Sequence, residues 1–408
     1  MQNSLVAVFK KNLRSSILVL ALLVIWLGFG IATPGYLSAD HIQNILTQMA
    51  IIAIMACGMV FVIVTGGIDL SVGYGAGFVS VFAAALLYFK IVENPIHALF
   101  PLLSVQGLEI ATAVVTVMLS MLLGVLIGVF QGSVIAFLAV PPFIATLGGM
   151  FIFKSGILLV TQGKSIFISK NDTYKFIAQG LLPPAAGLIL AAVVAAILFA
   201  MVFAGRKRKQ RYGIALKPLG LDLAKAAAFS VLIFGYVLIV NRTFEPEANA
   251  NVRGVPFLVV ILAIIAALMS YISTNTRFGR YAYAIGGNRE AARLSGINIK
   301  KSIFGIFVTM GALTGVSGIA LAAYVGSGTT GAGGGYELDV IASCILGGTS
   351  TLGGEGTVVG AVIGALIMQS LSNGLQMMNV NSNVQYLIKG LVLILAVWAD
   401  ISMKKKKA

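Results

Sequence analysis

The sequence predicts an all-α protein that crosses a membrane about 12 times, and three observations support this fold class. Hydrophobic residues make up 59% of the 408 residues and charged residues only 10%, whereas soluble domains carry about 25% charged residues. The apolar residues recur in many runs of about 20 residues, the length that a membrane-spanning helix needs. Many of the 47 glycines fall three or four residues apart, as in GYGAGF and GVSGIA, which is typical of closely packed membrane helices.

Most of the apolar runs are long enough to be single spanning helices. They are residues 17–32, 43–64, 71–89, 108–130, 143–161, 184–204, 221–240, 255–273, 303–325, 357–377 and 383–402. One shorter run, 339–348, crosses only if it is tilted or extended by its neighbours. The first run follows Lys10, Lys11 and Arg14 as in a signal peptide, but no small-residue cleavage site follows cleanly. We therefore expect the first run to remain as a helix.

The distribution of basic residues predicts that both chain ends lie on the cytoplasmic side. With the N-terminus inside, the inner segments hold 19 of the 28 Lys and Arg residues and the outer loops hold six. The remaining three, Lys154, Lys225 and Lys389, fall near or within predicted spans. Because cytoplasmic loops carry the excess of Lys and Arg, the sequence predicts an N-in, C-in protein with an even number of crossings. The net charge of +15 then needs no nucleic-acid partner.

Two Gly-rich acidic breaks interrupt the apolar runs, TGGIDLSVG at 65–73 and ELDVIASCILGGTSTLGGEG at 337–356. We expect both on the cytoplasmic half. A carboxylate at membrane depth, such as Asp69, costs roughly 2.5–3.5 kcal/mol on insertion scales, so it is usually functional or specially housed. An Asp at a helix start can accept an amide hydrogen two or three residues on, which favours a helix cap. Contact with a transported substrate and a place at a moving joint are the alternatives.

No motif predicts a catalytic, nucleotide-binding or metal site. QGKS at 162–165 lacks the upstream glycine of a phosphate loop, because Leu158 stands there. Cys57 and Cys344 have no metal-ligand spacing, and the chain has only two histidines. We therefore expect no enzyme and no bound metal. A proton-driven carrier would need several buried acids or histidines as a relay, so the energy source is expected on another polypeptide.

The longest inner loop, 274–302, contains EAARLSG at 290–296, a run of good helix formers surrounded by basic residues. A solvated amphipathic turn anchored by its charge is one interpretation. The other is a short helix lying across the cytoplasmic surface, which a soluble motor protein could grip.

Four sequence blocks resemble the permease subunits of bacterial monosaccharide ABC importers, the group of the ribose, xylose and galactoside permeases. The blocks are GGIDLSVG, VPPFIATLGG, GRYAYAIGGNREAARLSGI and CILGGTSTLGGEGTVVGAVIGA, and with their flanking spans they cover nearly the whole chain. Ribose-type permeases have one span between the second and third blocks, whereas this chain has three. That longer form and the ending NGLQMMNV are most similar to xylose-type permeases, with galactose and multiple-sugar permeases close behind.

The resemblance implies a ten-helix core with two inserted helices in a single transmembrane domain, residues 1–408. A first helical half would cover 17–161, the inserted pair 184–240, and a second half 255–402 with its coupling loop 274–302. It also implies a multi-pass protein of the bacterial inner membrane that works with an ABC ATPase, an extracytoplasmic sugar-binding protein and a second permease copy. ATP and Mg would bind the ATPase, so no cofactor is expected on this chain.

The resemblance further implies that 284–298 holds the coupling helix that docks on the ATPase. The general signature of ABC permeases matches here, although its Leu-Pro ending is replaced by Phe307 and Val308. The residues expected to couple are Gly286, Gly287, Asn288, Glu290, Ala291, Ala292 and Gly296.

Because sugars are neutral, the pathway should offer amides, hydroxyls and aromatic faces. The candidates for the pathway or the helix breaks are Thr65, Asp69, Ser71, Thr349, Ser350, Asn373 and Gln376. Side chains of these types also commonly form hydrogen bonds between helices instead of binding a ligand. Three other functions stay open at this point: an ABC permease for branched-chain amino acids, a proton-coupled sugar carrier, and a membrane-embedded glycosyl-transfer enzyme.

Overall fold

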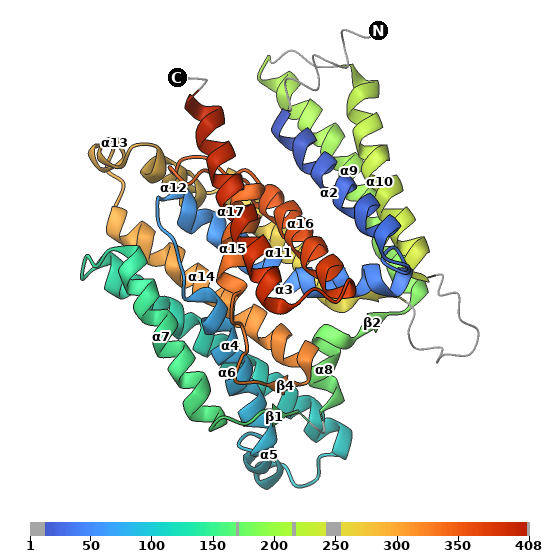
Figure 1. Ribbon diagram of the computed structural model, residues 1–408, viewed down its shortest axis with the longest axis vertical. Helices are drawn as coiled ribbons and strands as arrows, with labels where there is room; N and C mark the ends of the chain where they lie inside the picture. The colour runs from blue at the N-terminus through green and yellow to red at the C-terminus, as the bar shows by residue number, and fades with distance from the viewer. Residues whose placement is uncertain (1–12, 169–170, 214–217, 242–253, 406–408) are drawn as a thin grey trace.

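The computed structural model describes residues 13–168, 171–213, 218–241 and 254–405, which are almost entirely helical (Figure 1). Within these residues, eight helices are long and apolar enough to cross a membrane, and a bent pair adds a ninth. The pair is α4 (Val72–Tyr88) and α5 (Glu93–Leu99), inclined by 45° at their break. The prediction of an all-α polytopic membrane protein is therefore confirmed.

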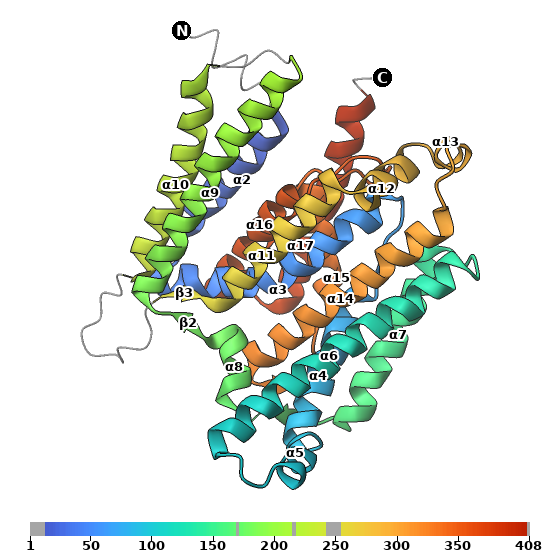
Figure 2. The same ribbon diagram turned by 180° about the vertical axis from the view of Figure 1, so that it is seen from behind.

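Helix α3 (Ala39–Val64) is the centre of the molecule (Figures 1 and 2). Its most apolar stretch is 94% buried within the chain itself, so other helices cover it on all sides. They are α11 (Phe257–Asn275), α14 (Ile299–Val325), α15 (Tyr336–Leu346) and α16 (Val358–Met377). Helix α15 is the short run expected at 339–348, and α16 is in turn covered by α2 (Leu13–Ala32).

Helices α6 (Val105–Ala136) and α14 cross through facing glycines. A methyl group on Gly124 would lie 2.5 Å from the Cα of Gly315, and one on Gly128 would lie 2.5 Å from the Phe307 carbonyl oxygen. The backbones can approach this closely only because no side chain separates them. Such close packing stabilises the helix pair in lipid, where no hydrophobic effect drives helices together. Helix α7 (Pro142–Thr161) packs on α4.

Two short antiparallel ribbons join parts of the chain that are distant in sequence. Strand β1 (Ile166–Phe167) pairs with β4 (Ser327–Gly328) beside α8 (Asp172–Gln179). Strand β2 (Leu181–Leu182) pairs with β3 (Val255–Pro256). Neither these ribbons nor α5 was expected from apolar length, because turns and distant pairing partners define them.

The second ribbon encloses the helix pair α9 (Pro184–Arg211) and α10 (Leu219–Asn241). The two helices pack on each other and form a small hydrophobic cluster of their own around Ala191 and Val237. They also share an ion pair, Arg206 to Asp222 at 2.8 Å. This pair occupies the positions of the two inserted spans expected at 184–204 and 221–240.

The segments rich in basic residues gather at one end of the molecule. The first turn of α2, the last turn of α9, α13 (Arg289–Leu294) and the last turn of α17 (Ser382–Lys405) all lie toward the top of Figure 1. Helix α5 lies at the opposite end. Helix α12 (Arg277–Gly287) leads into α13 at the basic end, which we call the inner end from here on.

Candidate functional site

The four sequence blocks that stand apart along the chain meet at the inner end of α3. The Val64 carbonyl accepts a hydrogen bond of 2.9 Å from the Gly354 amide, and the Tyr283 hydroxyl donates one of 2.8 Å to the Gly356 carbonyl. Gly286 fits against both partners of the first bond, since a methyl group there would overlap the Val64 carbonyl. We call residues 64–71, 142–146, 283–287 and 347–356 the inner junction.

Asp69 lies in the turn between α3 and α4 and is buried. Its Oδ1 accepts two hydrogen bonds from Ser71, one from the amide at 2.8 Å and one from the hydroxyl at 2.6 Å. The expected bond from an amide two residues on is therefore present, but the N-cap position of α4 is Ser71 rather than Asp69. The turn is an Asx turn that leads into the helix. Burial raises the pKa of Asp69 to about 6, and the bonds from Ser71 lower it.

The first turn of α7 holds this Asx turn in place. The Thr146 hydroxyl donates a hydrogen bond of 3.2 Å to the Ile68 carbonyl, and a methyl group on Gly67 would touch Pro142 at 3.7 Å. Thr65, another predicted pathway residue, bonds back to Val62 at 2.8 Å. The hydroxyl of Thr65 therefore completes the end of α3.

The second break, between α15 and α16, contains Thr349 and Ser350, both fully buried. The Ser350 amide donates to the Glu355 carbonyl at 2.8 Å, and the Ser350 hydroxyl accepts from the Leu352 amide at 3.1 Å. These bonds close a tight turn. The Thr349 hydroxyl lies buried without a hydrogen-bond partner among the described residues.

The predicted coupling residues form an exposed helical corner at the inner end. Asn288 caps α13, because its side chain accepts the Ala291 amide at 2.9 Å. Glu290 and Arg293 form an ion pair with both side chains about two-thirds exposed. Ala292 is buried against the protein, whereas Leu294 is 76% exposed. An apolar side chain presented beside charges on a short rigid helix is suited to contact with another protein.

At the opposite end of α3, five polar side chains form an outer polar network. They are Asn44 and Gln48 of α3, Tyr324 of α14, and Gln369 and Asn373 of α16. Gln48 is the centre: its Oε1 accepts from Gln369 at 2.7 Å and from Asn373 at 3.2 Å, and its Nε2 donates to Tyr324 at 2.7 Å. All five side chains are neutral hydrogen-bonding groups. Such groups suit a neutral, hydroxyl-rich ligand.

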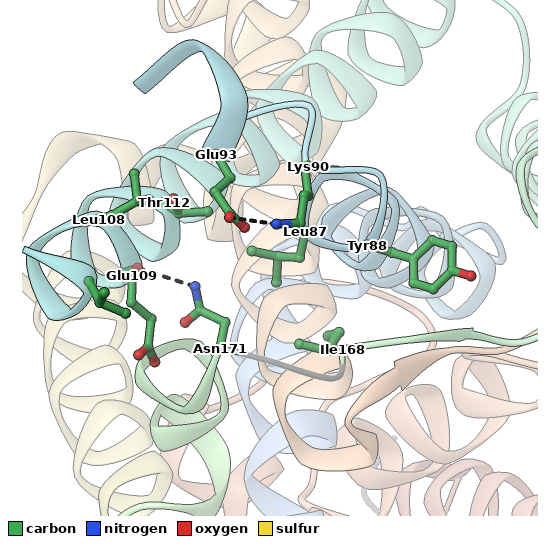
Figure 3. A pocket seen from close by; sticks show the side chains of 10 residues that line it. Leu87, Tyr88, Lys90, Glu93, Leu108, Glu109, Thr112, Ile168 and Asn171 are labelled. Atoms are coloured by element: carbon green, nitrogen blue, oxygen red, sulfur yellow. Dashed lines mark hydrogen bonds and ion pairs between the residues drawn. The ribbon is translucent and has the colours of Figure 1, made fainter. Parts of the chain in front are cut away.

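The network borders a cavity of about 200 Å³ between α3, α8 and α14, lined by Asn44, Gln179 and Tyr324 among others. A second cavity, of about 230 Å³, lies where α5 and α6 begin (Figure 3). There Lys90 pairs with Glu93 at 2.8 Å, and the Asn171 side chain donates to the Glu109 carbonyl at 3.2 Å.

The sequence located the inner junction better than the outer polar network. Of the two amides predicted on α16, Asn373 is buried in the network, whereas Gln376 is exposed and takes no part in it. Asn44, Gln48 and Gln369 were missed. The available signal was their spacing, because Asn44 and Gln48, like Gln369 and Asn373, stand four residues apart on one helix face.

Within the described part of the chain, no three His, Cys, Asp or Glu residues lie close enough to hold a metal ion. The two natural cysteines are free and buried.

Comparison with known proteins adds three relatives and one family. The sequence profile of the family described as branched-chain amino acid transport system / permease component matches residues 41–242 and 238–397. The xylose transport system permease protein XylH of Haemophilus influenzae is 39% identical over 97% of this chain and 98% of its own. That of Escherichia coli K12 is 36% identical over 97% and 93%. The ribose import permease protein RbsC of Haemophilus influenzae is 31% identical over 95% and 93%. No solved structure gives a significant match.

Proposed function

We propose that this chain, which belongs to the family of branched-chain amino acid transport system / permease components, is the permease of an ATP-driven xylose importer. It is a multi-pass protein of the inner membrane. An ABC sugar permease is the function supported by relatives that match nearly its full length, two of them xylose permeases at 36% and 39% identity. Ribose is the next candidate, because ribose permeases match at 31% and 32%.

The observation that carries the coupling part of the proposal is the inner junction. An ATPase that moves α13 also moves α12, and α12 touches the end of α3 through Gly286 and the turn before α16 through Tyr283. Both helix breaks are therefore mechanically connected to the exposed coupling corner. Irregular backbone at such depth is tolerated where it is buried in protein or lines a cavity, so the breaks are suitable joints for alternating access.

The outer polar network supports a sugar as the substrate. Its groups are amides and a tyrosine hydroxyl, with no fixed charge that a neutral sugar would have to leave unpaired. In this proposal the substrate enters from the end at which Asn44 and Tyr324 are accessible and leaves toward the inner junction.

We also propose 12 crossings with both ends inside. Length and composition identify nine spans, and α2, α15 and α17 are the three further crossings that we propose. If α13 is cytoplasmic, each of these three helices connects the outer side to the inner side. The gathering of the basic segments at one end supports this orientation. Helices α9 and α10 then add an even number of crossings and leave the sidedness of the rest unchanged.

Three partners complete the proposal. A separate ATPase binds ATP and Mg and docks on α13; this chain binds neither. A sugar-binding protein delivers xylose at the end with α5, and a second copy of this chain completes the pathway within the lipid bilayer.

Reconstitution in proteoliposomes tests the proposal. The chain, its ATPase and its sugar-binding protein should take up radiolabelled xylose only when ATP is present on the ATPase side. Uptake by the chain alone without ATP would indicate a proton-coupled carrier instead. Uptake of leucine but not xylose would indicate an amino-acid permease. Turnover of a lipid-linked sugar would indicate a glycosyl-transfer enzyme.

A further inference from the structure

A third cavity, of about 160 Å³, lies between α15 and α17 and shares no lining residue with the inner junction or the outer polar network. It is lined by Gly334, Gly335, Tyr336, Asp339, Ser382, Gln385, Tyr386 and Lys389. The residues come from the beginning of α15, from the first two turns of α17 and from the glycine turn before α15. The cavity therefore lies toward the outer ends of two helices expected to cross the membrane.

A buried ion pair forms one wall of this cavity. The Lys389 Nζ lies 2.8 Å from Asp339 Oδ2, and the two side chains are only 15% and 5% exposed. Charges at membrane depth are costly and usually mark a pathway. The other carboxylate oxygen, Asp339 Oδ1, is buried without a hydrogen-bond partner among the described residues. A buried acceptor left unpaired beside a cavity can be satisfied by a ligand hydroxyl once its carboxylate turns toward that cavity.

The other walls carry aromatic rings and neutral polar groups. Glycine at 335 leaves room for the Tyr386 ring, because a methyl group there would lie 3.0 Å from it. A methyl group on Gly334 would lie 3.3 Å from the Tyr74 hydroxyl. Ser382 and Gln385 add a hydroxyl and an amide. Aromatic bodies with a few convergent polar groups are the usual lining of small-molecule sites.

A single charged side chain lies on the surface of α7, which is otherwise mostly apolar. Lys154 lies in the middle of α7, is exposed, and sits 5.5 Å from the centre of the Tyr74 ring. An exposed ammonium at this depth faces a water-filled space or another protein. Lys154, one of the three basic residues near or within predicted spans, therefore lies beside Tyr74, whose hydroxyl is close to Gly334 of the cavity.

We infer that this cavity is a hydroxyl-binding subsite for the transported sugar, an inference that rests on the proposed function. A small turn of the Asp339 carboxylate brings Oδ1 to the cavity, where it accepts a hydrogen bond from a sugar hydroxyl while Oδ2 keeps its bond to Lys389. Lys389 has three donors, so it can also donate to a sugar oxygen. A neutral sugar leaves the ion pair intact, whereas a zwitterionic amino acid would compete with it for both charges.

Thiol protection tests the subsite directly. Because both natural cysteines are fully buried, a Ser382→Cys variant offers one accessible thiol inside the cavity. Val384→Cys places a thiol on the same turn of α17 but outside it and serves as the matched control. We expect xylose to slow labelling of Ser382→Cys by a charged methanethiosulfonate at least severalfold and to leave Val384→Cys unchanged. Leucine should protect neither.

A charge-neutral pair tests the role of Asp339 without leaving a lone charge. Asp339→Asn with Lys389→Gln should raise the KM for xylose about tenfold or more, with a smaller fall in kcat. The same neutralisation of the outer, more exposed pair Asp172 and Lys175 is the control. A xylose-transporting complex that shows no protection at Ser382→Cys and an unchanged KM overturns the subsite alone. A wild-type complex that transports no sugar overturns the proposed function and the subsite together.

Discussion

The amide of Gly354 donates a hydrogen bond of 2.9 Å to the carbonyl of Val64. This bond joins the turn before α16 to the last residue of α3, and Gly286 of the coupling segment touches both of its partners. One backbone contact thus connects the segment expected to meet the ATPase with both helix breaks.

Gly286→Ala should uncouple the transporter, because the added methyl group overlaps the Val64 carbonyl and approaches the Gly354 amide to 2.6 Å. Backbone atoms must shift to accept it, at a cost of about 1–3 kcal/mol. We expect a lower thermal midpoint in detergent and ATP hydrolysis that xylose-loaded binding protein no longer stimulates. Gly235→Ala is the control, since a methyl group there meets nothing within 4 Å and the residue lies in α10, outside the coupling segment. Equal effects of the two variants would contradict the tight junction.

Glu290→Lys should reduce ATP-dependent uptake at least tenfold while the protein stays in the membrane. Its ion pair with Arg293 is largely exposed and contributes little to stability, roughly 0–1 kcal/mol, so the loss would come from the lost docking surface. Uptake and co-purification of the ATPase are the measurements. Asp172→Lys reverses an exposed charge at the start of α8, outside the coupling segment, and should retain uptake. Normal uptake by Glu290→Lys would contradict the proposal that α13 docks on the ATPase.

Asp69→Asn should retain folding and most transport, whereas Asp69→Leu should not. Asn offers an oxygen to the Ser71 amide and hydroxyl, and Leu leaves these buried donors unpaired at a cost of about 1–3 kcal/mol. Thermal midpoints in detergent and uptake measure the difference. If Asn is as damaging as Leu, the charge of Asp69 matters and not its acceptor oxygen.

The pH dependence of stability distinguishes these roles further. Burial raises the pKa of Asp69 in the folded protein to about 6, above its ordinary value of 3.8. Folding therefore binds a proton between these values, so the stability of the wild type relative to Asp69→Asn should increase as the pH falls from about 6 toward 4. Thermal midpoints of both proteins over this range measure it. A wild type that loses stability relative to Asp69→Asn would indicate that the carboxylate is ionised and paired.

Gln48→Met should destabilise the helices around the outer polar network. The variant removes the acceptor of both Gln369 and Asn373, and each buried donor left unpaired costs about 1–3 kcal/mol. Gln48→Met and Asn373→Met remove the same bond, so their effects on unfolding should be less than additive, with a coupling of about 0.5–3 kcal/mol. Gln376→Met, at an exposed position outside the network, is the control. Additive effects would mean that Gln48 and Asn373 do not interact.

The sequence predicted well those features that depend on a local property. Apolar length located α3, α6, α7 and α14, because a spanning helix must satisfy its own backbone and face lipid. The first helical turns were less well located: α14 begins at Ile299 rather than at 303, because the Asn298 side chain accepts the Lys301 amide and starts the helix earlier.

Features that depend on contact between distant segments were not predictable in this way. Lys389 was placed near or within a span and Asp339 in the acidic break 337–356, but nothing in their sequence surroundings shows that they pair across α15 and α17. Likewise, the four blocks were each recognised, yet their meeting at Val64 depends on how four helices pack. Spacing along one helix was informative, whereas no sequence pattern indicated which helix would be its partner.

The ribbon of β2 and β3 has a consequence for how such a chain changes in length. Leu182, which precedes α9, already lies beside Val255, which precedes α11, in antiparallel register. A segment whose two ends are neighbours can be gained or lost as a unit, because the rest of the protein needs only a short connection to close the gap. The segment that contains α9 and α10 can therefore be inserted or deleted during evolution without rearranging the rest of the transporter.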